Sequence, residues 1–314
     1  MVAAAACGAG SPAATATPEN TSLPTATLTL ENTLTPAATP TMEILLSQQG
    51  PSLPAPATEG DIDVGGGHVL SYKCWGEGSP AVIVEAGGGD KPTQSLSWNA
   101  VALGVLPTTR ICIYDRVNVP TSQDVAENLH ALLSKIPVPG PYILVAHSLG
   151  GWHARVFAHL FSREVAGMVL VDTTSTYPEA TIMIATAYPT YSAGEPASLT
   201  QSRVPAADIN TSLMASFDGL DMKASNEQVR QAGSFGDLPL VVIAHTPGPN
   251  DLRGFDPAIQ EQIAAIILKV TADQATLSSK GVFKVARTYD HFVSLYDPQT
   301  IIDAITQMVG EIRK

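Results

Sequence analysis

The sequence predicts an α/β domain whose core is a mostly parallel, doubly wound sheet of about eight strands. Two observations lead to this prediction. Short and almost entirely apolar segments, such as residues 81–85, 142–146 and 165–171, are typical of strands buried on both faces of a parallel sheet. Helical patterns separate these segments along the chain, and strands that alternate with helices form parallel sheets covered on both faces.

The composition limits the classes of function that fit the chain. Its 314 residues are enough for one large core or two smaller cores. It contains 29 acidic and 17 basic residues, and the resulting formal net charge of −12 argues against a nucleic-acid partner. No apolar run reaches the roughly 18 residues of a transmembrane helix, so no such helix is predicted.

The first 58 residues are predicted to form a disordered tail. They are mostly Thr, Pro, Ala, Ser and Gly, and such a segment buries too little apolar surface to offset its ordering entropy. Small residues precede Cys7, as in a bacterial lipoprotein, although the basic and long apolar parts of such a signal are missing. We therefore expect an exported bacterial protein, tethered to a membrane through Cys7 or otherwise extracytoplasmic. The alternative is a chance Ala/Cys run in a cytoplasmic protein.

The folded domain is predicted over residues 59–314 and begins with a β-hairpin over residues 62–75 that turns at three glycines. Further strands are predicted over residues 81–85, 110–114, 142–146, 165–171, 238–244 and 282–286. Helices are predicted over residues 98–106, 122–136, 149–161, 257–277 and 298–312. The alternation stops over residues 173–237, where short helices and loops are expected.

A strand–turn–helix motif places Ser148 at its apex. The segment Ala146-His147-Ser148-Leu149-Gly150 matches the pattern G-x-S-x-G, with alanine in place of the first glycine. Small residues are needed two positions before and after the serine, because bulkier ones would collide with the adjoining strand or helix. The turn raises the hydroxyl above the sheet, and the N–H of Leu149 can face a developing oxyanion. The alternative is an ordinary turn in which Ser148 caps the helix.

The order of motifs beyond the tail resembles the α/β-hydrolase superfamily, and in particular its esterase and lipase branch. The resemblance rests on the stretches SPAVIVEAGGG, TRICIYDR, GPYILVAHSLGG, VAGMVLVD and YDHFVSLYDPQTIIDAI. It implies a triad in the chain order Ser, acid, His, with Ser148 as nucleophile and His291 as base. It also implies a lid over residues 173–237, and it implies neither a metal nor a cofactor.

The triad acid has two candidates. In most members of the superfamily the acid follows the strand that corresponds to residues 240–244, but residues 245–248 here are His-Thr-Pro-Gly, and Asp251 comes later. A minority arrangement places the acid at the end of the preceding strand, where this chain has Asp172. Adjacent strand ends lie about 4.8 Å apart, so Asp172 can reach the same histidine. We expect Asp172 to be the acid, with Asp251 as the alternative.

The second oxyanion donor is expected in the glycine-rich turn after residues 81–85. There the backbone N–H of Gly87 or Gly88 can face a substrate carbonyl, because glycine allows a close approach. The alternative is a plain flexible turn. The superfamily often has His-Gly at this place, whereas this chain has Glu85-Ala86, so the resemblance does not define the substrate.

Other residues are predicted to have structural roles. Asp115-Arg116 resembles a family loop that an ion pair or a cap would fix. His147 is interpreted as a variable neighbour of the serine, and His245 as an ordinary surface or core histidine. Cys74 and Cys112 lie on strands that the family's usual order places side by side, so a disulfide and two reduced core cysteines are both open.

These residues together predict hydrolysis of a carboxylic ester or a related acyl bond in a small molecule. Amide, lactone or carbon–carbon bond hydrolysis and acyl transfer are alternatives on the same triad. A non-catalytic binding protein on a tether is an alternative of another class. The presence of both Ser148 and His291 favours an enzyme.

Overall fold

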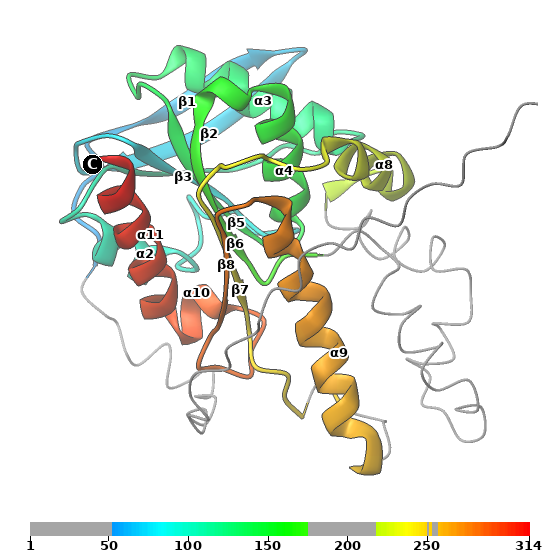
Figure 1. The fold of residues 1–314 in the computed structure, drawn as a ribbon. Helices are drawn as coiled ribbons and strands as arrows, with labels where there is room; N and C mark the ends of the chain where they lie inside the picture. Colours follow the sequence, from blue (N-terminus) through cyan, green and yellow to red (C-terminus); the bar gives the residue numbers. More distant parts are fainter. Residues whose placement is uncertain (1–51, 175–217, 250, 253–256) are drawn as a thin grey trace, which may run out of the picture. The chain divides into compact units, whose positions relative to one another are not determined.

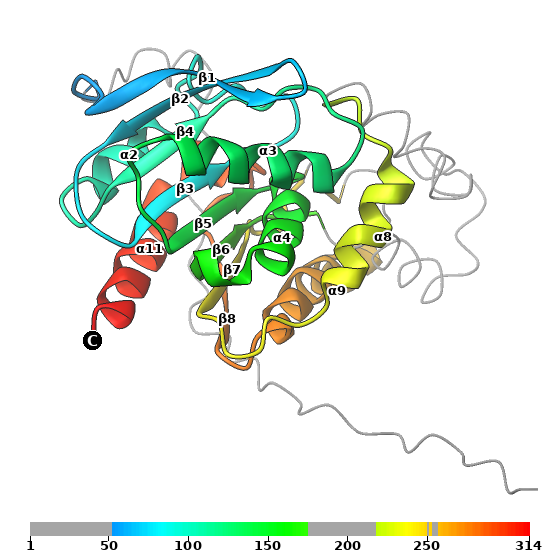
Figure 2. The same ribbon diagram turned by 90° about the horizontal axis from the view of Figure 1, so that it is seen from above.

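The computed structural model describes residues 52–174, 218–249, 251–252 and 257–314. Within these residues eight strands form one sheet in the order β1-β2-β4-β3-β5-β6-β7-β8 (Figure 1 and Figure 2). The strands span Thr58–Gly65 (β1), His68–Trp75 (β2), Ala81–Glu85 (β3), Ile111–Tyr114 (β4), Tyr142–His147 (β5), Val165–Val171 (β6), Leu240–Ala244 (β7) and Gly281–Val285 (β8). Strand β2 is antiparallel to β1 and β4, and the other neighbours are parallel. The predicted fold class is confirmed.

Helices cover both faces of the sheet. They span Asn99–Val105 (α2), Ser122–Lys135 (α3), Gly150–Leu160 (α4), Met222–Ala232 (α8), Gln260–Asp273 (α9), Val293–Tyr296 (α10) and Pro298–Ile312 (α11). Short 3-10 helices span Ser162–Glu164, Pro257–Ile259 and Gln274–Leu277. Helices α2, α10 and α11 pack together on one face (Figure 1), and α3, α4 and α8 pack together on the other (Figure 2).

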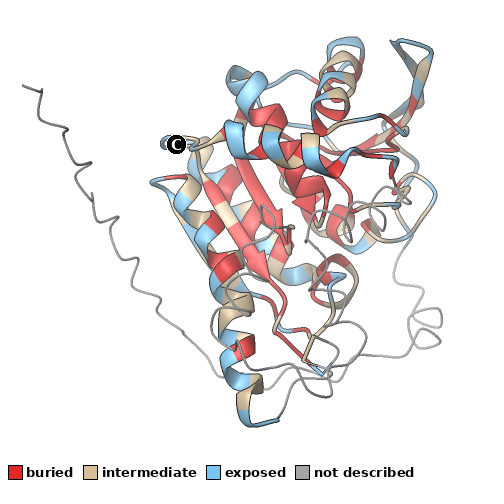
Figure 3. Cartoon of the chain, turned by 90° about the vertical axis from the view of Figure 1, so that its right-hand side faces the viewer, coloured by how far each residue is buried: buried red, intermediate tan, exposed pale blue. Residues whose placement is uncertain are grey.

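The centre of the sheet is the core of the domain. Every residue of β3, β4 and β5 is buried, and the middle of the sheet is correspondingly red in Figure 3. Leu129 of α3 and Phe157 of α4 pack on one face, whereas Val101 of α2 and Ile305 of α11 pack on the other. Burying one such side chain contributes about 1.5–3 kcal/mol. The strands that carry the candidate site are therefore held from both sides.

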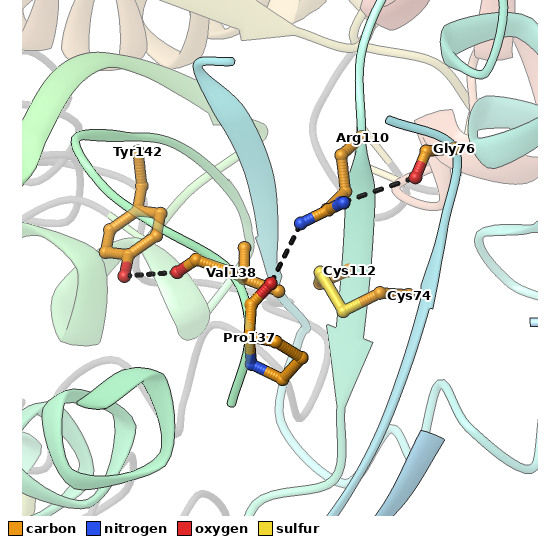
Figure 4. The surroundings of a disulfide bond; sticks show 7 residues. All are labelled: Cys74, Gly76, Arg110, Cys112, Pro137, Val138 and Tyr142. Carbon is orange, nitrogen blue, oxygen red and sulfur yellow. Dashed lines mark hydrogen bonds between the residues drawn. A yellow bond between two sulfur atoms is a disulfide. The ribbon is translucent and has the colours of Figure 1, made fainter. Parts of the chain in front are cut away.

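Cys74 and Cys112 form a disulfide between β2 and β4 (Figure 4). The two residues lie directly opposite each other in the antiparallel pair, with Cα atoms 4.1 Å apart. Arg110, at the start of β4, donates to the carbonyl oxygens of Gly76 and Pro137 at 3.3 and 3.0 Å. The sequence left this pairing open, because it depends on a strand order that residue spacing does not reveal.

The first strand begins before the predicted hairpin. Strand β1 starts at Thr58 rather than at residue 62, and its residues alternate between half-buried and exposed. Its first four residues, Thr-Glu-Gly-Asp, include no apolar side chain, so the apolar pattern begins only at Ile62, which explains the difference. The tail predicted over residues 1–58, including Cys7, lies mostly outside the described residues. None of the helices in the described ranges is both long and apolar enough to cross a membrane.

The predicted lid is described only at its ends. Residues 175–217 lie outside the described residues, and residues 218–237 contain α8. This helix begins at Asp221, whose carboxylate accepts from the N–H of Ala224 at 2.9 Å. It packs against α3 and α4, and the N–H of Ser122 donates to the Ser225 hydroxyl at 3.1 Å. The C-terminal end of the segment is thus fixed to the helical layer.

Candidate active site

Ser148 occupies the turn between β5 and α4, as the motif predicted. Its φ of 51° lies in the left-handed region, which a non-glycine residue adopts only at an energetic cost. Its N–H donates to the carbonyl of Val171 at 3.1 Å, and its own carbonyl accepts from the N–H of Gly151 at 3.0 Å. These bonds tie the turn to the neighbouring strand β6 and to the first turn of α4.

The two glycines after the turn are required by close packing. A Cβ on Gly150 would lie 2.3 Å from the carbonyl oxygen of Glu85, and one on Gly151 would lie 2.4 Å from a side-chain carbon of Thr173. The first of these contacts is with backbone, which cannot move away cheaply. The helix therefore reaches the sheet only because residue 150 is glycine.

Asp172 follows β6 and also has a positive φ, of 47°. Its N–H donates to the carbonyl of Ile243 on β7 at 2.6 Å, which fixes the residue between the two strands. Its Oδ2 lies 2.5 Å from Nδ1 of His291. Asp251, the other acid candidate, instead lies against His245 and accepts from the N–H of Gly248 at 2.7 Å. Of the two candidates, the structure brings Asp172 to His291.

His291 lies in the loop after β8, and its side chain is 45% exposed. Because Nδ1 donates to Asp172, the neutral ring carries its free lone pair on Nε2. His147, the residue before Ser148, donates from Nε2 to the carbonyl of His291 at 2.9 Å, and the two ring centroids lie 4.6 Å apart. The histidine loop is therefore attached to the serine turn itself.

His245 belongs to this cluster, although the sequence suggested an ordinary role for it. It is the first residue after β7, and its Nδ1 lies 2.6 Å from Oδ2 of Asp172. Its backbone N–H donates to Oδ1 of the same carboxylate at 3.2 Å, and its Nε2 lies 3.2 Å from Asp251 Oδ2. The only sequence signal was position: the histidine stands just after the strand where the resemblance expects a carboxylate.

The charges in the cluster reinforce one another. Burial alone would raise the pKa of Asp172, but hydrogen bonds from His245 and His291 outweigh it and hold the pKa well below its usual range. Burial alone would lower the pKa of His245, but its contacts with Asp172 and Asp251 raise it to about 10. At neutral pH the cluster therefore holds an aspartate and a protonated His245.

His147 has the opposite electrostatics. Burial, with a smaller contribution from the nearby His291, lowers the pKa of His147 to about 4. Its ring is therefore neutral at pH 7, which agrees with its role as a donor to the carbonyl of His291. The sequence suggests only a variable neighbour of the serine, but in the structure His147 links the serine turn to the loop that carries His291.

Acidification is expected to destabilise the fold through His147. The unfolded chain binds a proton at this ring below pH 6.5, whereas the folded chain binds it only near pH 4. The free energy of unfolding should fall by up to about 3 kcal/mol across that window, through this residue alone. Urea denaturation at pH 7 and pH 4.5 measures the fall in wild type and in His147→Gln, which should lose less. An equal loss in both proteins would contradict the prediction, and the exposed-residue control His159→Asn should behave like wild type.

The glycine-rich loop after β3 lies directly against the serine turn. A Cβ on Gly87 would lie 2.8 Å from Nδ1 of His147 and 3.5 Å from Cβ of Ser148. Gly88 follows, half-buried, and Leu149 is buried at the start of α4. The three predicted oxyanion residues therefore lie on the two segments that flank Ser148.

Arg116 holds this loop in place. Its guanidinium donates to the carbonyl oxygens of Ala86 and Gly87, both at 2.6 Å. It also forms ion pairs with Glu85 at 2.7 Å and with Asp218 at 2.9 Å. The ion pair expected for this arginine is present, and Asp218 connects it to the end of the predicted lid.

Glu85, which replaces the family's usual histidine, belongs to the same buried network. Its carboxylate accepts from the Tyr114 hydroxyl and from Arg116. Burial raises the pKa of Glu85, with Arg116 opposing this effect. Burial alone would lower the pKa of Arg116, but Glu85 and Asp218 outweigh it and raise the pKa above its usual range. Glu85 thus helps to hold the loop by pairing with Arg116, which donates to the loop carbonyl oxygens.

Asp172, His245 and His291 could also be considered as metal ligands, because their three donor atoms lie within 4.8 Å of one another. The separations of 2.5 and 2.6 Å between the two Nδ1 atoms and Oδ2 are hydrogen-bond lengths. Ligand atoms around a tetrahedral zinc ion lie roughly 3.3 Å apart, given Zn–N distances of about 2.0–2.1 Å. The arrangement therefore fits shared protons better than a metal ion.

Comparison with known proteins agrees with this architecture. Residues 91–239 match the family model described as the alpha/beta hydrolase fold. Cfl2 from Burkholderia cenocepacia has a similar structure, with a TM-score of 0.52 and 16% identity over 79% of this chain and 94% of its own. A candidate lipase from Acinetobacter baumannii has a TM-score of 0.50 and 15% identity, over 82% and 92% of the two chains. At these identities the likeness shows the fold alone.

Similarity to a curated protein is local. A protein of Hormonema carpetanum named "Probable transporter efuK" is 32% identical over 113 residues, which is 32% of this chain. The aligned part spans only 16% of that protein's length. The match therefore concerns one segment of a much longer protein.

Proposed function

Since this chain has the α/β-hydrolase fold, we propose that it is a serine hydrolase that cleaves a carboxylic ester or a related acyl bond. The observation that carries the proposal is the 2.5 Å contact between Asp172 and Nδ1 of His291, next to the strained turn at Ser148. A nucleophile, a base and an acid thus come from the ends of β5, β8 and β6. This combination supports nucleophilic catalysis.

The geometry supports a two-step reaction. Nε2 of His291 takes the proton of the Ser148 hydroxyl as its oxygen attacks the acyl carbon, and Asp172 stabilises the imidazolium that forms. The tetrahedral oxyanion accepts hydrogen bonds from the N–H of Leu149 and of Gly87 or Gly88. The intermediate collapses to an acyl-enzyme, and His291 protonates the departing alcohol. Water then attacks the acyl-enzyme with His291 as base, which releases the acid and restores Ser148.

The rigid loop after β3 supports the oxyanion role. The guanidinium of Arg116 donates hydrogen bonds to the carbonyl oxygens of Ala86 and Gly87. Peptide units whose oxygens are held on one side present their N–H groups in fixed directions, and fixed donors lose little free energy to reorganisation during the reaction. The loop therefore suits stabilisation of a developing negative charge.

Labelling with a fluorophosphonate probe tests the proposal. Because such probes phosphonylate activated serines, the wild-type protein should be labelled, and peptide mapping should place the label on Ser148. A panel of p-nitrophenyl esters of increasing chain length, with an amide and a lactone, then defines the acyl bond that is cleaved. Absence of label, or a label on another serine, would contradict the proposal and would favour a binding protein.

A further inference from the structure

His245 makes three contacts with carboxylates, two of them hydrogen bonds to Asp172 and the third an ion-pair contact with Asp251. Its backbone N–H and its Nδ1 reach the two oxygens of Asp172, and its Nε2 lies 3.2 Å from Asp251. Only a doubly protonated imidazole can offer a proton on both ring nitrogens. Its side chain is 10% exposed, so water does not replace these partners. A carboxylate oxygen lies within 3.2 Å of each ring nitrogen, and this arrangement favours an imidazolium between two carboxylates.

These contacts determine how Asp172 is held. Oδ2 accepts from Nδ1 of His245 and from Nδ1 of His291, and Oδ1 accepts from the N–H of His245. A carboxylate with donors on both oxygens cannot rotate without breaking one of them. Without the His245 side chain, Oδ2 would keep a single donor, and that donor comes from a half-exposed loop.

We propose that His245 is a positioning residue of the Asp172–His291 pair, which fixes the carboxylate and offsets its charge so that the group Asp172–His245–Asp251 sets the basicity of His291. This inference rests on the proposed function, since it assigns a role in the same triad. The three groups carry −1, +1 and −1, so the net charge that His291 faces is −1. Asp172 alone would also present −1, but without a fixed orientation.

The surroundings of His291 come from several elements of the described chain. Asp172 lies at the end of β6, and His245 and Asp251 follow β7. The ring of His245 lies 6.4 Å from that of His291, nearly at right angles. Neutral His147 lies at the end of β5, and Asp290, in the same loop, accepts from the N–H of Phe292. The imidazolium of His245 is therefore a positive charge that acts on His291 across the shared carboxylate.

Three variants separate charge from structure. His245→Asn keeps an amide N–H near the position of Nδ1 but removes one positive charge, Asp251→Asn removes one negative charge, and the double variant removes both. His245→Asn should move the acid limb of the pH profile of kcat/KM upward by about one unit, because a cation near 6 Å is lost. Asp251→Asn should move it downward, and the double variant should return it to within about 0.3 units of wild type. His130→Asn, at the surface, is the matched control and should not move it.

The same variants are measured without substrate by titrating the ¹³C-labelled ring of His291 by NMR. The NMR midpoints should shift in the same order, so a protein that cleaves no ester would still test this inference separately from the proposed function. A purely structural role predicts a lower kcat with an unmoved acid limb and no recovery in the double variant, and that result overturns the proposal. If His245→Asn does not fold, Asp251→Asn alone decides, and an unmoved midpoint overturns it.

Discussion

Replacing Ser148 by alanine is expected to lower kcat for ester hydrolysis by about a million-fold. The substitution removes the only atom that can form the acyl-enzyme in the proposed mechanism, while the backbone N–H of Leu149 stays in place. The residual rate then comes from oxyanion stabilisation and binding alone. Alanine has nearly the volume of serine and the same difficulty with a positive φ, so the fold should persist. Steady-state kinetics with the best ester of the panel measures the loss.

The control for this variant is Ser134→Ala. Ser134 is exposed on α3, and its hydroxyl donates only to the carbonyl of Ala131. This variant should retain wild-type kcat. If Ser148→Ala kept more than about 1% of the wild-type rate, the serine could not be the nucleophile, and a water attack assisted by the cluster around Asp172 would have to be considered.

Replacing Asp172 by asparagine is expected to lower kcat by about ten thousand-fold. An asparagine amide at this place can donate to Nδ1 of His291, which would put the ring proton on Nε2 and remove the base. The substitution also leaves the imidazolium of His245 facing an uncharged group, which costs stability as well as activity. Both kcat and the free energy of unfolding are therefore measured for this variant.

Two further aspartate variants serve as comparisons for Asp172→Asn. Asp251→Asn should lose less than about tenfold in kcat, because Asp251 contacts His245 rather than His291. Asp237→Asn should retain wild-type kcat. Asp237 lies before the amino-terminal end of β7, whereas the cluster lies at the carboxyl ends of the strands, and its side chain is 86% exposed. If Asp251→Asn lost activity while Asp172→Asn retained it, the assignment of the acid would be reversed.

The sequence was informative where one residue type could meet a local requirement. The elbow at Ser148 is visible because the close approach of Glu85 demands a glycine at position 150, and this demand appears in the sequence as a motif. Most strands were placed to within two residues for a related reason, since strands buried on both faces must be apolar along their whole length. Strand β1, whose first four residues include no apolar side chain, begins four residues earlier than expected.

The sequence did not predict the full set of residues that meet around Asp172. The members of this cluster come from the ends of β6 and β7 and from the loop after β8, and their distances depend on strand order and on loop paths. The sequence favoured Asp172 over Asp251 only by analogy with a minority arrangement, and its one sign of a role for His245 was the position of this histidine directly after β7. The pairing of Cys74 with Cys112 was open for the same reason, because it follows from the neighbourhood of β2 and β4.

The positive φ angles of Ser148 and Asp172 have a consequence for how the protein evolves. A left-handed backbone at an L-residue costs roughly 1–2 kcal/mol, and glycine at either position would remove that cost. Selection for folding alone would therefore favour glycine at both strand ends. The fold carries this instability at the two positions whose side chains the proposed mechanism uses, so a lineage in which that mechanism was lost would gain stability by replacing both residues with glycine.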